Sequence, residues 1–214
     1  MTFQGWPEEA LEFYEGLEAD NTKTYWTAHK ASYEEHVLAP MAELLEELAP
    51  EFGETRIFRP YRDVRFSPDK SPYKTHIGGV IGDGYIQLSA AGLATANGMY
   101  SMATDQLDAY RRAVAADLPG TELEQLAAEI KGHGIELHYR DALKTAPRGY
   151  SPDHPRVELL RYKGLWAWQD WPAAAWLGTA QARDRVSTFL RDSAPLARWL
   201  ARHVGPSAEP PRRR

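Results

Sequence analysis

The segment from Arg62 to His76 carries the residues best suited to chemistry in this chain. It reads RDVRFSPDKSPYKTH and contains four cationic side chains, Arg62, Arg65, Lys70 and Lys74. Guanidinium groups bind phosphate or carboxylate through paired hydrogen bonds, and an ammonium group adds a mobile point charge. Prolines in the segment limit the backbone entropy that it would lose on binding. These residue types predict a site for a small anionic ligand that bears phosphate or carboxylate.

Other side chains extend this predicted site. Tyr73 and Phe66 could stack on a ring of the ligand, and His76 ends the run. Arg148, in the Pro/Gly-rich stretch 144–155, is expected to close the site as a second donor. We therefore predict ligand contacts from Arg62, Arg65, Lys70, Tyr73, Lys74, His76 and Arg148.

An enzymatic alternative uses the same segment. Asp63 or His154 would act as general acid or base, and the neighbouring cations would stabilise negative charge on a phosphorylated or acyl substrate. Asp153 precedes His154 and can orient its ring. The chain has no cysteine, no G-x-S-x-G and no metal-ligand spacing, so we expect no metal and no cofactor. The sequence leaves open whether the protein is an enzyme.

The charge distribution supports a structural interpretation of the same cations. Residues 1–55 carry 13 carboxylates and two lysines, a net charge of −11, whereas residues 56–76 carry +4. The basic segment could pair with the acidic helices, or with its own Asp63 and Asp69. The acidic helices could instead bind a basic protein partner through Glu43, Glu46, Glu47 and Glu51.

The whole chain has 214 residues and a formal charge of −5. An acidic balance disfavours nucleic acid as a ligand without removing it from consideration. No run of 18 apolar residues is present, so we expect no membrane span. The first residues lack the basic and apolar stretches of a secretory signal, which favours a cytoplasmic location. The oligomeric state stays open.

Helices are expected in the N-terminal third and strands in the middle. One helix follows Pro7 to about Asp20, and another begins near Thr22 or Thr24 and is ended or kinked at Pro40. Three short strands follow as an antiparallel meander, with Asp83-Gly84 supplying hairpin chemistry. Their predicted ranges are 76–81, 85–90 and 93–100.

The C-terminal half reads as further helices with two extended segments. A capping box from Thr121 to Glu124 predicts the start of a helix, and Pro195 is expected to interrupt the last helical stretch. Trp166 and Trp168 share one face of an extended segment and could form a core or a stacking platform for bases or sugars. The predicted ranges are helix at 106–117, 121–131, 157–161 and 173–200, extended structure at 135–140 and 164–171, and a disordered tail at 205–214.

These elements predict one α+β domain over residues 1–204. The helical N-terminal third should pack on a small antiparallel sheet, with further helices in the C-terminal half. The sheet and its connections would then position the basic segment.

The basic segment and two later runs resemble the domain of unknown function 2461 family. The later runs are KTAPRGYSPDHP at 144–155 and LLRYK at 159–163, and Tyr25-Trp26, Tyr33 and Pro40 are similar to the opening helix pair of that family. The resemblance covers roughly residues 3–203. It departs at Asn21-Thr22, where the family has two asparagines, and at Tyr25-Trp26, where it has Trp-Phe. The resemblance implies a recurring domain without an agreed activity, substrate or cofactor.

Overall fold

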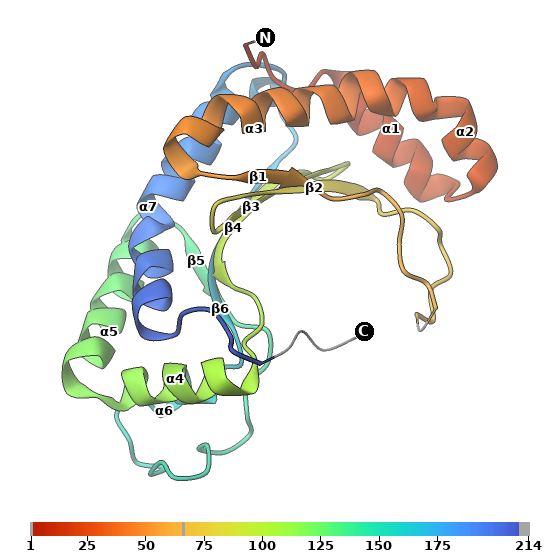
Figure 1. Ribbon diagram of the computed structural model, residues 1–214. Coiled ribbons are helices and arrows are strands. Elements are labelled where there is room, and N and C mark those ends of the chain that lie inside the picture. Colours follow the sequence, from red (N-terminus) through yellow and green to blue (C-terminus); the bar gives the residue numbers. More distant parts are fainter. Residues whose placement is uncertain (1, 66, 210–214) are drawn as a thin grey trace. The chain divides into compact units, whose positions relative to one another are not determined.

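Figure 1 shows the computed structural model, which describes residues 2–65 and 67–209. The described strands form one sheet in the order β1-β2-β3-β4-β6-β5, and the predicted α+β class is confirmed. The helical elements are α1 (Glu8–Ala19), α2 (Lys23–Ser32), the π-helical turn η1 (Tyr33–Leu38), α3 (Ala39–Phe52), α4 (Thr104–Ala115), α5 (Asp117–Gly132), α6 (Val157–Arg161), the 3₁₀ turn η2 (Ala175–Gly178) and α7 (Gln181–His203). The strands are β1 (Thr55–Ile57), β2 (His76–Ile81), β3 (Gly84–Ser89), β4 (Gly92–Met99), β5 (Glu136–His138) and β6 (Leu165–Pro172).

The chain divides into two compact units. The first is built from the chain up to Thr95 together with Asp170–Leu190, and the second from Ala96–Gln169 together with the chain from Arg191 onward. The strands β4 and β6 and the helix α7 contribute residues to both units. The predicted domain range 1–204 stays a prediction.

In the first unit, local capping and a π-helical turn shape the predicted helices. The Thr22 side chain accepts a hydrogen bond from the Tyr25 N–H at 3.2 Å and caps α2, close to the helix start that the sequence predicted. Pro40 does not end the helical run, because η1 widens the turn just before it and α3 continues to Phe52. A π-helical turn accommodates a proline that cannot donate to the preceding turn. Val37 and Met41 are both fully buried on either side of this junction.

The predicted meander is confirmed to within one residue at each end. β2 and β3 pair antiparallel from His76↔Ser89 to Ile81↔Gly84. A Cβ added at Gly79 would lie 2.9 Å from Leu45 Cδ1, so this face of β2 packs closely against α3. Strand alternation places His76, Gly78 and Val80 on the opposite face. Figure 1 shows α3 running along β1 and β2 on the covered side.

The second unit holds α4, α5 and α6 around β5 and β6. Arg156 connects them: it donates to Glu124 Oε2 at 2.8 Å and to Thr121 Oγ1 at 2.9 Å, and its side chain is only 10% exposed. Tyr110, fully buried on α4, donates to the Leu159 carbonyl of α6 at 3.0 Å. The extended segments predicted at 135–140 and 164–171 are confirmed as β5 and β6.

Several predicted boundaries are wrong. The helix predicted from Thr121 starts at Asp117, so Thr121 lies inside α5 and its hydroxyl serves Arg156 instead of capping the helix. Pro195 does not interrupt α7, since buried side chains such as Phe189 and Trp199 hold the helix on both sides of it. The three-residue strand β1 was not predicted.

The described part of the C-terminal tail contacts α4. Ser207 Oγ donates to Asp105 Oδ1 at 2.8 Å, and the Ala208 N–H donates to Asp105 Oδ2 at 2.7 Å. Residues 210–214, part of the tail predicted to be disordered, lie outside the described residues, as does Phe66. Within the described residues, no helix combines the length and the apolar character that crossing a membrane requires.

Candidate functional site

The predicted basic segment forms a long excursion between β1 and β2, residues 58–75 of the first unit. Its two arms pair with each other: the Lys74 N–H donates to the Pro60 carbonyl at 2.8 Å, and the Arg62 N–H donates to the Pro72 carbonyl at 2.9 Å. Tyr61 and Tyr73 form an antiparallel bridge between these contacts. Figure 1 shows the excursion projecting from the sheet beside α2. The backbone pairing of β1 and β2 therefore continues into the excursion and fixes the positions of its basic residues.

Tyr73 anchors the excursion to the N-terminal helices. Its ring stacks on Trp26 of α2, with centroids 4.4 Å apart and planes 8° from parallel, and only 4% of Tyr73 is exposed. Asn21 hydrogen-bonds both backbone groups of Tyr73: its amide donates to the carbonyl and its oxygen accepts from the N–H, each at 3.1 Å. Burial raises the pKa of the Tyr73 phenol. Tyr73 thus packs against α2, and its predicted ligand contact stays a prediction.

At the outer end of the excursion the predicted cations have internal partners. Arg62 donates to Asp69, and Arg65 donates to both oxygens of Asp63, at 2.9 and 2.6 Å. The predicted pairing of Asp63 and Asp69 with their own arginines is therefore confirmed. The Lys70 ammonium donates to the Val64 carbonyl at 3.0 Å. Ligand contacts from Arg62, Arg65 and Lys70 stay predictions.

These ion pairs bear on the proposed acid–base role of Asp63. The Arg65 guanidinium lowers the pKa of Asp63 to about 2, and hydrogen bonds from Arg62 and Ser71 hold the pKa of Asp69 below its ordinary value. A carboxylate with so low a pKa takes up a proton poorly at neutral pH. In this structure Asp63 pairs with Arg65, and its acid–base role stays a prediction.

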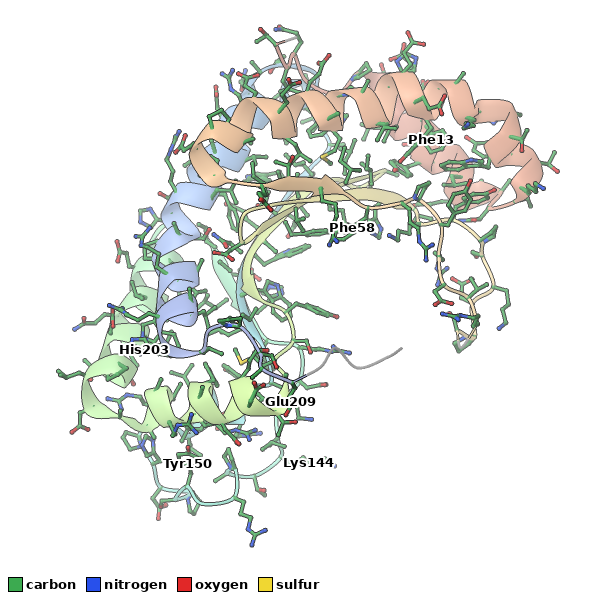
Figure 2. All side chains as sticks on the ribbon, in the orientation of Figure 1. Phe13, Phe58, Lys144, Tyr150, His203 and Glu209 are labelled. Carbon is green, nitrogen blue, oxygen red and sulfur yellow. The ribbon has the colours of Figure 1, made fainter. Side chains whose placement is uncertain are left out.

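At the inner end of the excursion, two cations lie over one ring on the open face of the sheet, and further basic residues are close in the chain. We call this group the cationic face and define it by Arg56, Phe58, Arg59, Lys74 and His76. The Arg56 guanidinium carbon lies 5.0 Å from the centroid of the Phe58 ring, and the Lys74 ammonium lies 5.4 Å from it. Lys74 also donates to the Arg59 carbonyl at 2.9 Å. Figure 2 shows Phe58 on the side of the strands that faces away from α3.

The electrostatics of the cationic face are those of crowded positive charge. Burial and then Arg59 lower the pKa of Lys74, and burial and then Lys74 lower the pKa of His76. In the part of the chain that the structure describes, Arg56, Arg59 and Lys74 form no ion pair with a carboxylate. Arg59 is within electrostatic range of Asp63, but both oxygens of that carboxylate bond Arg65. An anion placed here would relieve repulsion between neighbouring cations.

Two side chains of β3 border the cationic face. The Tyr85 ring lies 6.2 Å from Phe58, and its hydroxyl donates to Gln87 Oε1 at 2.9 Å. Gly78 leaves room for the Tyr85 side chain, since a Cβ at residue 78 would lie 2.6 Å from the Tyr85 hydroxyl oxygen. Burial raises the pKa of Tyr85 to about 12, so its hydroxyl stays protonated at neutral pH. The face thus combines permanent charge with neutral hydrogen-bonding groups.

Arg148 and His154 belong to the second unit. Arg148 is exposed in a turn in which the Tyr150 N–H donates to the Pro147 carbonyl at 3.1 Å. His154 Nδ1 accepts from the Arg156 N–H at 3.0 Å, and its carbonyl accepts from Val157 N–H at 2.9 Å, so the residue supports the start of α6. The predicted closure by Arg148 and acid–base role of His154 stay predictions. Within the described residues, no group of three His, Cys, Asp or Glu side chains could hold a metal.

Sequence reasoning included Lys74 and His76 but missed Arg56, Phe58 and Arg59. A signal was available in the alternation of Arg56 and Phe58, since alternate residues of a strand share a face. It was overlooked because β1 is only three residues long and ends before Phe58.

The fold and the site define a class: an α+β protein whose antiparallel sheet carries a cationic face beside a long paired excursion. The family model described as "Conserved hypothetical protein (DUF2461)" matches residues 9–199, and the chain belongs to this family. The resemblance drawn from the basic segment is therefore confirmed. No curated protein and no solved structure matches the chain.

Proposed function

We propose that this protein binds a small anionic ligand, bearing phosphate or carboxylate, at the cationic face. The observation that carries the proposal is the gathering of Arg56 and Lys74 over the ring of Phe58, with Arg59 and His76 beside them. Among the described residues these cations have no carboxylate in an ion pair, so holding them together is costly in the free protein, and an anion would stabilise them.

The position of Lys74 supports a binding role. Its backbone is fixed through Pro60, and its neighbour Tyr73 is buried against α2. The ammonium spends one donor on the Arg59 carbonyl and has two more for a ligand. A preordered lysine loses little conformational entropy on binding, which favours affinity.

The ligand's charge follows from the residues around it. Arg56 and Arg59 can each give a carboxylate or a phosphate two parallel hydrogen bonds, and Lys74 adds a third positive charge. Protonation of His76 supplies a further charge as the pH falls. Tyr85 can turn its hydroxyl toward a neutral part of the ligand.

The test compares Lys74→Met with Lys70→Met. Each lysine donates to one carbonyl of the excursion, at 2.9 Å for Lys74 and 3.0 Å for Lys70, although Lys74 is half-buried and Lys70 is exposed. Only Lys74 lies over Phe58. The probes are inorganic phosphate, phosphomonoesters and dicarboxylates, first in a thermal-shift screen and then by calorimetric titration. A ligand at a hundred times its Kd stabilises by about 2.7 kcal/mol, or roughly 5–10 °C for a chain of this size.

We expect at least one probe to bind and Lys74→Met to weaken its binding about tenfold or more, the loss of one charge-assisted hydrogen bond. Lys70→Met should bind the probe like the unaltered protein. Equal weakening by both variants would show that the anion is not bound specifically at the cationic face and would refute the assignment. Unchanged binding by a folded Lys74→Met would refute the assignment to the cationic face.

A further inference from the structure

A second surface, in the second unit, carries aromatic side chains on one face of β5 and β6. His138 opposes Trp166 across the two strands, and Glu136 opposes Trp168. Residues that oppose each other in an antiparallel pair share a face, and so do residues two apart. The predicted common face of Trp166 and Trp168 is borne out by the ring of His138, whose centroid lies 5.9 Å from each indole.

Tyr100 and Arg140 extend this face beyond the strands. The Tyr100 ring lies 5.0 Å from Trp166, and the Arg140 guanidinium carbon lies 5.2 Å from the centroid of Tyr100. We call the six residues the aromatic platform: Tyr100, Glu136, His138, Arg140, Trp166 and Trp168.

The platform's rings and polar groups reach solvent at its edges. Trp166 is 9% exposed and forms the floor, whereas Tyr100 is 61% exposed and Arg140 is also exposed. The Glu136 side chain is 78% exposed, and its Oε2 lies 3.0 Å from His138 Nε2. An exposed tyrosine beside a buried tryptophan leaves apolar ring surface in water, which a ligand could cover.

The charge of the platform separates two ligands that stack on aromatic rings. A single-stranded nucleic acid needs cations along its backbone, but here one arginine is balanced by one carboxylate. A sugar is neutral, has an apolar C–H face for stacking, and has hydroxyl groups that both donate and accept. Glu136 supplies acceptors and Arg140 supplies donors at the platform's edges.

We propose that the aromatic platform binds the pyranose rings of a neutral oligosaccharide. Tyr100 and Trp168 stack on the C–H faces of the sugar rings, Glu136 accepts hydrogen bonds from hydroxyl groups, and Arg140 donates to hydroxyl oxygens. The site is independent of the cationic face, which involves other residues and a ligand of other charge.

The experiment titrates the full chain with cellohexaose, chitohexaose and maltohexaose, and with oligo(dT) as a polyanionic probe. Binding is followed by tryptophan fluorescence and calorimetry at about 0.15 M salt, where exposed charges are well screened. Tyr100→Ala and Trp168→Ala remove the stacking rings. Tyr61→Ala is the matched control, because Tyr61 is a tyrosine of similar exposure, 50%, in the other unit.

We expect one of the hexasaccharides to bind, Tyr100→Ala and Trp168→Ala each to weaken its binding about tenfold or more, and Tyr61→Ala and Lys74→Met to leave it unchanged. The proposal is overturned if none of the hexasaccharides binds or if binding survives both ring deletions. Oligo(dT) binding that is lost in the same two variants would overturn it in favour of nucleic acid. Because Lys74→Met alters only the cationic face, sugar binding by this variant tests the aromatic platform independently of the anion site.

Discussion

Asn21→Ala should loosen the excursion from the helices and destabilise the protein. Asn21 hydrogen-bonds both the N–H and the carbonyl of Tyr73, each at 3.1 Å, and only 4% of Tyr73 is exposed to solvent. An unsatisfied buried polar group costs about 1–3 kcal/mol, but Asn21 is itself partly exposed, so water can replace some of the lost bonding. We therefore expect a loss of about 2 kcal/mol, which lowers Tm by roughly 4–8 °C in a chain of this length.

The assay is thermal and urea unfolding of Asn21→Ala beside Thr24→Ala. Thr24 is exposed on the first turn of α2, so its truncation should change stability by no more than about 0.5 kcal/mol. Anion affinity should fall in Asn21→Ala as well, because Lys74 follows the residue that Asn21 holds. If the two variants unfold at the same temperature, Asn21 does not anchor the excursion and the reasoning fails.

Three further predictions concern pH, close packing and a buried arginine. Burial and Lys74 lower the pKa of folded His76 below its ordinary value of 6.5. The stability that the neutral imidazole contributes is therefore complete above pH 6.5 and is lost as the pH falls from there through the folded pKa. The stability difference between the unaltered protein and His76→Gln should shrink in that window, and a difference that stays constant as the pH is lowered would contradict the prediction. Gly5→Ala should lower the free energy of unfolding by about 3 kcal/mol or more, since Gly5 has φ +109° and an added Cβ would lie 2.2 Å from the Thr179 backbone nitrogen. Gly132→Ala is the control: its Cβ would meet nothing within 4 Å, so it should be neutral or stabilising by up to about 1 kcal/mol. Denaturant unfolding of the two variants checks the difference. Arg156→Ala should lower the free energy of unfolding by about 3 kcal/mol, because it removes the bonds to Glu124 and Thr121 and leaves the carbonyls of Val114 and Ala116 without this donor. A loss below about 1 kcal/mol in denaturant unfolding would show that water replaces these bonds.

The elements that the sequence predicted well are those whose signals are local. In β3 buried and half-buried residues alternate, and Gly82 supplies a positive φ at the turn between β2 and β3, so neighbouring residues determine this hairpin. Thr22 caps α2 through a bond three residues along the chain. Each signal lies within a few residues of the structure that it specifies.

The errors arose where distant contacts decide the local structure. Pro195 stays inside α7 because side chains on both sides of it are buried, and periodicity alone does not measure that gain against the cost of a missing N–H. Thr121 has the spacing of a capping residue, yet Arg156, 35 residues away, bonds its hydroxyl. The short strand β1 exists through its pairing with β2, for which three residues carry too weak a pattern.

The candidate site shows the same division at the level of charge. The sequence shows how many cations are present but not which of them already have a carboxylate partner. The presence of such a partner determines whether an anion would gain free energy by binding to the cation. At the outer end, a ligand must compete with Asp63 for Arg65 and with Asp69 for Arg62, so each new bond replaces an existing one. At the inner end, Lys74 is destabilised as a cation by burial and by Arg59, and an anion removes that penalty instead of breaking an ion pair. Under the proposed function, positive charge therefore stabilises the structure at the outer end of the excursion and binds the anion at the inner end. Arg65→Gln should then lower the stability of the protein, measured by thermal unfolding, more than it lowers the affinity for the anion.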